Sequence, residues 1–217
     1  MNIRLNKAHY PVTVLGPGRR IGVWVQGCSI GCTGCASRDT WDTEGGKDLP
    51  VDLLMKWCRD VSLNHLDGVT ISGGEPFQQP EALGCLLDSL IGWRKEMAHS
   101  VDILCYSGLP YRVLQSRYPD LLGKLDAIIP EPFVAKRPMG GIWRGSDNQS
   151  LIPLSPLGME RYSQYVDQKE KEEKRFQIQV DPNRIWFIGI PFRGDMAAVE
   201  ERCAEKGLLM GQTSWRA

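Results

Sequence analysis

The stretch "VQGCSIGCTGCASRDTW", residues 25–41, places three cysteines within eight positions of an otherwise ordinary sequence. Cys28, Cys32 and Cys35 follow the spacing C-x-x-x-C-x-x-C in a loop that contains glycines, so their sulfur atoms can converge. Residues 20–26, "RIGVWVQ", are rich in β-branched and aromatic residues and have glycines on both sides, which predicts a strand. The three thiols are therefore expected at the carboxyl end of a buried strand.

Beyond this loop, predicted strands and helices alternate. Runs of aliphatic and β-branched residues predict further buried strands at 68–74, 101–108 and 124–132. A short helix is predicted at about 110–118, and two longer ones are predicted from apolar residues at helical spacing, namely Leu54, Trp57, Cys58 and Val61 in the first and Leu83, Leu86, Leu87 and Leu90 in the second. The alternation indicates an α/β fold with parallel strands and outer helices. Right-handed crossovers bring the carboxyl ends of such strands to one edge.

The composition is that of a globular protein with no overall charge. The chain has 217 residues, of which 42% are hydrophobic, and its 26 basic residues balance 26 acidic ones. No global field therefore attracts it to nucleic acid or to an anionic membrane. The sequence begins without the apolar core of a secretory signal and holds no membrane-spanning run, so we expect a soluble cytoplasmic protein. Its seven cysteines are odd in number and indicate metal or redox chemistry rather than disulfides.

The regular alternation breaks after the fourth predicted strand. Residues 131–175 are expected to form a long loop excursion, since much of this segment is rich in Gly, Pro, Ser and Asn. Two more strands are predicted at 175–180 and 184–190, followed by a closing helix that begins near Asp195 and ends at Gly207. With no clear linker between these parts, the whole of residues 1–217 is expected to form a single domain.

The cysteine spacing has more than one interpretation. Structural zinc is held by four ligands, and no nearby cysteine pair or histidine pair supplies the fourth. An iron–sulfur cluster is bound through thiolates, and three of them leave one iron of a [4Fe–4S] cluster open to another ligand. The spacing favours such a cluster over a zinc site or a purely structural loop. Cys58, Cys85, Cys105 and Cys203 lack metal-binding spacing and are expected to be core thiols.

A second motif follows the second predicted strand. The segment "ISGGEPFQQP", residues 71–80, places Gly73, Gly74, Glu75 and Pro76 at the same edge of the sheet as the cysteine loop. Two adjacent glycines let a ligand approach the backbone, and the Glu75 carboxylate can accept a hydrogen bond from an ammonium group. The alternative interpretation is a tight turn before a helix.

Together the two motifs resemble the radical S-adenosylmethionine (SAM) enzymes. The resemblance implies an incomplete (β/α) barrel with its active site at the carboxyl ends of the strands. It implies that Cys28, Cys32 and Cys35 bind a [4Fe–4S] cluster whose open iron is chelated by SAM, and that the glycine motif lines the methionine end of SAM. Reductive cleavage of SAM would give a 5′-deoxyadenosyl radical that abstracts hydrogen. No further catalytic residue is expected beyond the cluster and SAM.

Within that superfamily the chain is most similar to activating enzymes of glycyl-radical proteins, especially the activators of anaerobic ribonucleotide reductase. The segments "GCTGCASRDTW", "CYSGLPYRVL" and "WRGSDNQ" carry this similarity. It implies that Tyr106, Ser107 and Gly108 lie near the ribose of SAM, that the substrate is a backbone glycine of a partner protein, and that flavodoxin or ferredoxin donates electrons. The alternatives are radical SAM modification of a peptide or small metabolite, and a non-enzymatic metal-binding interaction module.

Two positions depart from the pattern of the superfamily or of the activating enzymes. Many radical SAM enzymes have an aromatic residue before the third cysteine to contact adenine, and here that position is Gly34. Where the activating enzymes have an Asp-Gly turn after the fourth strand, this chain has "IPEPF", which includes Glu131.

The segment "IWRGSDNQS", residues 142–150, is a candidate substrate-binding strip. Arg144 offers a planar fork of donors, and Ser146 and Asn148 offer both donors and acceptors. Such a strip can bind an extended peptide. It can equally hold its own loop, because Asp and Asn favour local turn hydrogen bonds.

Overall fold

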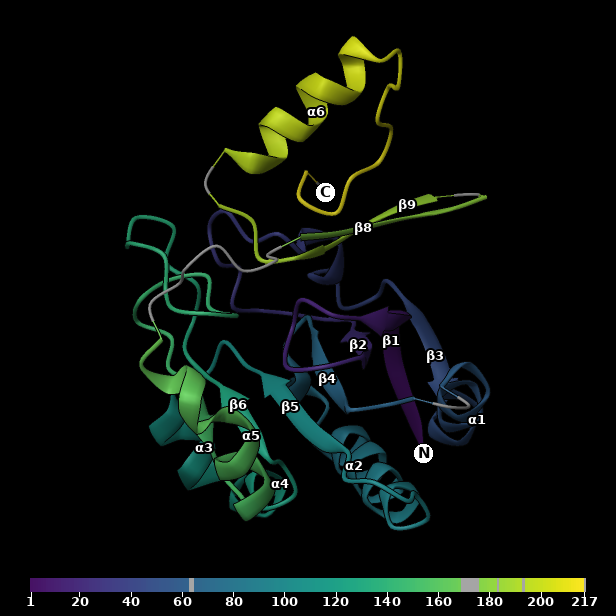
Figure 1. The fold of residues 1–217 in the computed structure, drawn as a ribbon, viewed down its shortest axis with the longest axis vertical. Helices are drawn as coiled ribbons and strands as arrows, with labels where there is room; N and C mark the ends of the chain where they lie inside the picture. The colour runs from purple at the N-terminus through teal and green to yellow at the C-terminus, as the bar shows by residue number, and fades with distance from the viewer. Residues whose placement is uncertain (63–64, 169–175, 183, 193, 217) are drawn as a thin grey trace.

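The computed structural model describes residues 1–62, 65–168, 176–182, 184–192 and 194–216. Its main body is a seven-stranded sheet in the order β3-β1-β2-β4-β5-β6-β7 (Figure 1). The strands are β1 (Asn2–Val12), β2 (Arg20–Val25), β3 (Lys47–Pro50), β4 (Gly68–Gly73), β5 (Asp102–Tyr106), β6 (Ala127–Ile129) and β7 (Ile152–Pro153).

Four central strands form the parallel part of the sheet, as the sequence predicts. β2 pairs with β4, β4 with β5, and β5 with β6, all in parallel, while β1, β3 and β7 pair antiparallel at the two sides. Val25 at the end of β2 lies opposite Gly73 at the end of β4, and Tyr106 lies opposite Ile129. The carboxyl ends of the central strands therefore meet at one edge, which confirms the α/β prediction.

The helices cover the sheet with the apolar faces that their spacing predicts. The helices of the main body are α1 (Val51–Val61), α2 (Pro80–Arg94), α3 (Tyr111–Arg117), α4 (Pro119–Leu122) and α5 (Pro156–Val166). In α1, Leu54 and Cys58 are buried, and in α2 all four predicted leucines are buried. Burial of each such side chain contributes about 1.5–3 kcal/mol, so this interface is a main source of stability.

The segment 131–175 differs from the expected loop excursion. Its first part is irregular as expected, but β7 and α5 follow, and residues 169–175 lie outside the described part. Ser155 caps α5 by accepting a hydrogen bond from Gly158 N at 3.0 Å, and Pro156 occupies the first turn. The sequence does not predict this helix, because it lacks an apolar stripe at helical spacing. Accordingly α5 buries only Gly158 and Tyr162.

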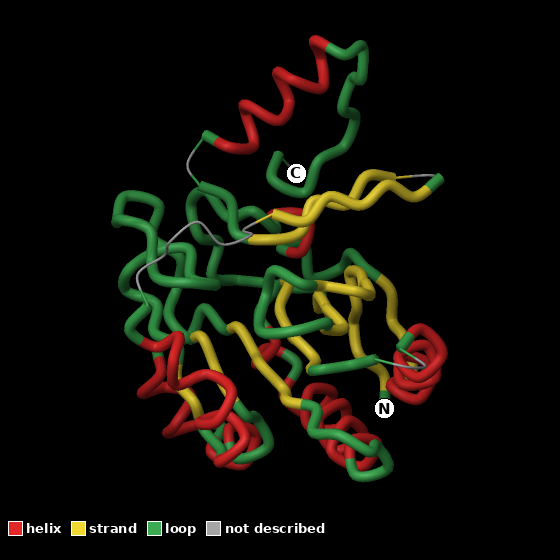
Figure 2. Tube along the Cα trace, in the orientation of Figure 1, coloured by secondary structure: helices red, strands yellow, loops and turns green. Residues whose placement is uncertain are grey.

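The last two predicted strands do not extend the parallel sheet. β8 (Phe176–Asp181) and β9 (Arg184–Gly189) pair antiparallel with each other in a separate hairpin. Figures 1 and 2 show this hairpin and α6 (Asp195–Glu205) at one end of the molecule, with the C-terminus between them. Ile188 of β9 packs with Val12, Leu15 and Trp24 of the main body. No described helix is long and apolar enough to cross a membrane.

A buried ionic network joins the amino ends of the central strands. Arg20 at the start of β2 and Asp102 at the start of β5 are both fully buried, with Arg20 Nη2 2.7 Å from Asp102 Oδ1. Arg20 Nε also donates to Thr70 Oγ1 at 2.6 Å, and Arg161 and the Tyr162 hydroxyl donate to Asp102. Burial alone would raise the pKa of Asp102, but Arg20 and the other donors hold it below its usual range. The network lies at the edge opposite the cysteine loop.

Candidate cluster and cofactor site

The cysteine loop leaves β2 and returns to its own starting point. Gly27 N donates to Thr40 O at 2.8 Å, and Cys28 N donates to Trp41 O at 3.1 Å. The Gln26 side chain also joins the two ends of the loop, because its Nε2 donates to Asp42 O at 2.7 Å. The backbone therefore holds the loop at the end of β2 without using the thiols.

The three predicted cluster ligands lie on this loop as half-buried free cysteines. Burial raises the pKa of Cys32 and of Cys35, and the charge of Cys28 raises both further, so the three sulfurs are near one another. Ser37 N lies 3.4 Å from Cys35 Sγ and donates to it, as expected of a loop that surrounds thiolates.

The donor set fits an iron–sulfur cluster. Three thiols spread around one loop, with a backbone N–H directed at a sulfur, match the ligands and the sulfur hydrogen bonds of iron–sulfur proteins.

The Gly73-Gly74 pair is where the second motif meets the cysteine loop. Gly74 N donates to Val25 O and Glu75 N donates to Gly27 O, each at 2.8 Å. A Cβ on Gly74 would overlap the carbonyl group of Gly27. The glycine is thus required for close packing between the two loops, and contact with a ligand stays a prediction.

The Glu75 carboxylate is fully buried and joins the ends of β4 and β5. Oε1 accepts hydrogen bonds from Phe77 N at 3.0 Å and Ser107 Oγ at 2.9 Å, and Oε2 accepts one from Gly108 N at 2.7 Å. Burial raises the pKa of Glu75, and these three donors oppose the rise. The protein's own donors thus occupy most of the roughly four acceptor positions of this carboxylate.

Replacing Glu75 by glutamine is expected to lower the free energy of unfolding by about 1–3 kcal/mol. The amide nitrogen would face a donor, Gly108 N or Ser107, in a fully buried site. Urea unfolding under anaerobic conditions measures the change. Glu81→Gln on the exposed side of α2 is the matched control and should change stability by less than about 0.5 kcal/mol. Equal stability of both variants would show that the carboxylate does not hold the two strand ends together.

The other predicted cofactor residues lie at the same edge. Ser107 is buried, and Ser107 N donates to Ile129 O of β6 at 3.0 Å. The Tyr106 hydroxyl donates to Trp143 O at 2.9 Å, and burial raises its pKa. A Cβ on Gly108 would stand 2.5 Å from Ile30 Cδ1 of the cysteine loop. The structure therefore brings both motifs and residues 106–108 together, and their contact with SAM stays a prediction.

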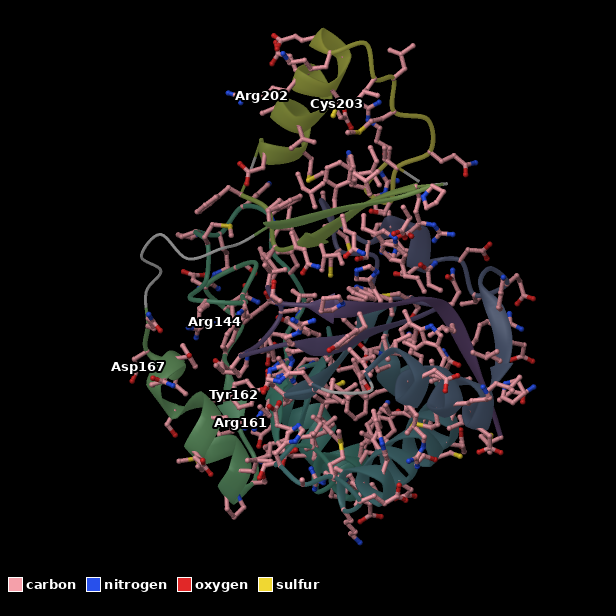
Figure 3. All side chains as sticks on the ribbon, turned by 45° about the vertical axis from the view of Figure 1, so that its right-hand side comes forward. Arg144, Arg161, Tyr162, Asp167, Arg202 and Cys203 are labelled. Atoms are coloured by element: carbon pink, nitrogen blue, oxygen red, sulfur yellow. The ribbon has the colours of Figure 1, made fainter. Side chains whose placement is uncertain are left out.

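The candidate substrate strip makes contacts within its own chain. Arg144 donates to Val166 O at 2.9 Å and to Tyr165 O at 3.3 Å at the end of α5, and Figure 3 shows it beside Asp167. Ser146 Oγ accepts from Val134 N at 3.1 Å, and Asn148 Nδ2 donates to Pro132 O at 2.8 Å. These contacts agree with the interpretation that the strip holds its own loop.

Several glutamines that the motifs did not single out complete the site. Gln79, four residues after Glu75, accepts from Arg4 N at 2.7 Å and donates to Gln26 O at 2.9 Å. Gln149 donates to Glu131 O at 3.0 Å. Gln79 and Gln149 lie in the quoted segments "ISGGEPFQQP" and "WRGSDNQ", but the pattern gives neither one a role, since a glutamine has no fixed role until its partners are known.

Residues 14–152 match the model of a protein family described as a 4Fe-4S single cluster domain. The match includes the four parallel strands, the cysteine loop and the glycine motif. It covers more than half of the chain.

Similar proteins agree with this match. An anaerobic ribonucleoside-triphosphate reductase-activating protein of Enterobacteria phage T4 is 31% identical over 140 residues, which are 64% of this chain and 86% of that protein. The protein of that name in Vibrio cholerae is 30% identical over 147 residues, which are 66% of this chain and 94% of that protein. The pyruvate formate-lyase 1-activating enzyme of Escherichia coli K12 is 47% identical over 74 residues, which are 32% of this chain and 29% of that enzyme. The chain belongs to the single-cluster 4Fe-4S family and, within it, to the radical SAM activating enzymes. The family resemblance and the predicted iron–sulfur cluster are thereby confirmed.

Proposed function

We propose that this protein cleaves SAM reductively and uses the 5′-deoxyadenosyl radical to remove hydrogen from a backbone glycine of a partner glycyl-radical protein. The observation that carries the proposal is the contact between the cysteine loop and the glycine motif at the carboxyl ends of β2 and β4. The names of the relatives, which are reductase-activating proteins and a lyase-activating enzyme, support a protein substrate. Flavodoxin or ferredoxin would supply the electron.

In this proposal the chain provides three groups of residues around the cofactors. Cys28, Cys32 and Cys35 hold the cluster, which supplies the electron for cleavage when bound. Residues 73–76 line the methionine end of SAM. Residues 106–108 line the ribose. Glu75 holds residues 73–76 against residues 106–108, because its carboxylate accepts hydrogen bonds from both Ser107 and Gly108.

The fold that we propose is an incomplete (β/α) barrel in a single domain spanning residues 1–217. Four parallel strands with outer helices support the barrel, and its antiparallel side strands leave it open. An open side suits a large substrate, since a protein loop must reach the radical. The packing of Ile188 on residues of β1 and β2 supports a single domain.

Anaerobic reconstitution tests the proposed function. We expect about four irons and four sulfides per chain, and with SAM and a strong reductant we expect methionine and 5′-deoxyadenosine. Adding a candidate glycyl-radical protein, such as an anaerobic ribonucleotide reductase, should give a protein-based radical detectable by electron paramagnetic resonance. Bound zinc without sulfide would contradict the enzyme. SAM cleavage with hydrogen transfer to a peptide or small metabolite, and not to that protein, would favour the alternative substrate class.

A further inference from the structure

Beside the cysteine loop, an aromatic side chain occupies the space next to Gly34. A Cβ on Gly34 would stand 3.5 Å from Phe133 Cε1, which is van der Waals contact. Phe133 follows β6, about a hundred residues further along the chain, and is half-buried. The other neighbour of this position is Ala135, whose Cβ would stand 3.4 Å away.

The ring is seated between two glycines. On its other side, a Cβ on Gly145 would stand 2.9 Å from Phe133 Cδ2 and 3.3 Å from Cε2. The first distance is shorter than a carbon–carbon contact allows, so a side chain at 145 would displace the ring. Gly145 is therefore needed to let Phe133 lie against the cysteine loop.

Three polar side chains hold the backbone around Phe133 in place. Ser146 Oγ accepts from Val134 N, Asn148 donates to Pro132 O, and Gln149 donates to Glu131 O. Residues 131, 132 and 134, on both sides of Phe133, are thus held by three residues of one loop. We call residues 145–149 the frame. Because the frame already holds the ring in one position, the ring loses less conformational entropy when a ligand binds.

The backbone of Phe133 also reaches the cluster ligands. Phe133 N donates a hydrogen bond to the sulfur of Cys32. Phe133 therefore contacts the cysteine loop at two places, Gly34 through its ring and Cys32 through its backbone.

We propose that Phe133 packs against the adenine ring of SAM, and that residues 145–149 form the frame that positions it. The inference rests on the proposed function, because it requires SAM to bind at the cluster. A purine has a flat π-face, and an aromatic side chain held rigidly and half-exposed is the group that stacks on it. It also gives the strip 142–150 a role in cofactor binding rather than in direct contact with substrate.

The test compares SAM binding by cluster-loaded variants in equilibrium dialysis. Phe133→Leu should bind SAM about tenfold more weakly than the unchanged protein while keeping full iron and sulfide, and Phe133→Tyr should bind within about twofold. Phe187→Leu in the hairpin is the matched control and should bind normally. Methionine alone, which has no adenine, should bind the Phe133→Leu variant and the unchanged protein equally.

The other possible outcomes distinguish failure of the proposed function from failure of the inference about Phe133. If the unchanged protein loads its cluster but does not bind SAM, the proposed function fails and this inference fails with it. If the unchanged protein binds SAM and Phe133→Leu binds equally well, only the inference is overturned. If the Phe133→Leu variant loses iron, the Phe133→Met variant is tested in its place. Loss of iron in both variants overturns the inference and shows that the ring is purely structural.

Discussion

Replacing Cys28, Cys32 or Cys35 by alanine, one at a time, is expected to remove essentially all bound iron and sulfide. Each thiolate would hold one iron, and the remaining two ligands do not retain a cluster in competition with solvent and chelators. Iron and sulfide analysis after anaerobic reconstitution measures the loss, and the visible absorbance of the cluster provides a second readout. SAM cleavage should disappear in parallel.

Cys85→Ala and Cys203→Ala are the matched controls. Both cysteines are partly exposed on helices, whereas Cys58 and Cys105 are fully buried and their replacement would also perturb packing. The controls should keep full iron content. Circular dichroism should show that the ligand variants stay folded, because backbone bonds from Gly27 and Cys28 close the loop. Full iron in any ligand variant would remove that residue from the cluster.

The parts of the fold that could be predicted depend on local patterns. The strand predicted at residues 20–26 agrees with β2 to within one residue, and the four leucines predicted to face the core are buried in α2. Both patterns are specified by neighbours a few positions away. β1 was not predicted because polar and charged residues such as Arg4 and Lys7 interrupt its apolar alternation. Its strand character depends on pairing with β2 and β3.

The candidate site could be predicted only as far as its motifs extend. The cysteine spacing and the glycine pair are short enough to recognise by eye. Two partners of Glu75 lie more than thirty residues away, so the sequence offers no sign that Ser107 and Gly108 engage its carboxylate. Phe133 is still more distant from Gly34 in sequence. Such contacts arise because parallel strands bring their carboxyl ends together, which depends on the whole sheet.

Asp102→Asn is expected to lower the free energy of unfolding by about 3–5 kcal/mol. The variant leaves the guanidinium group of Arg20 fully buried without a counter-charge, and it removes an acceptor from Arg161 and Tyr162. Urea unfolding followed by tryptophan fluorescence measures the change. Asp60→Asn is the matched control, because the Asp60 side chain is 60% exposed in its ion pair with Lys56. It should cost less than about 1 kcal/mol.

The dependence of stability on pH separates the charge of Asp102 from its packing. The folded-state pKa of Asp102 is lowered, so the aspartate stabilises the fold above its unfolded pKa of about 3.9 and loses that contribution as the pH falls through the folded value. Asparagine does not titrate, so the difference in stability between the two proteins should be largest near neutral pH and should shrink in acid. Replacing both buried partners, Arg20→Met with Asp102→Leu, should recover part of the loss, because the buried charge of Arg20 is then removed, while Arg161 and the Tyr162 hydroxyl still lack their acceptor. A constant difference at all pH values, with no recovery in the double variant, would show that shape rather than charge makes Asp102 essential.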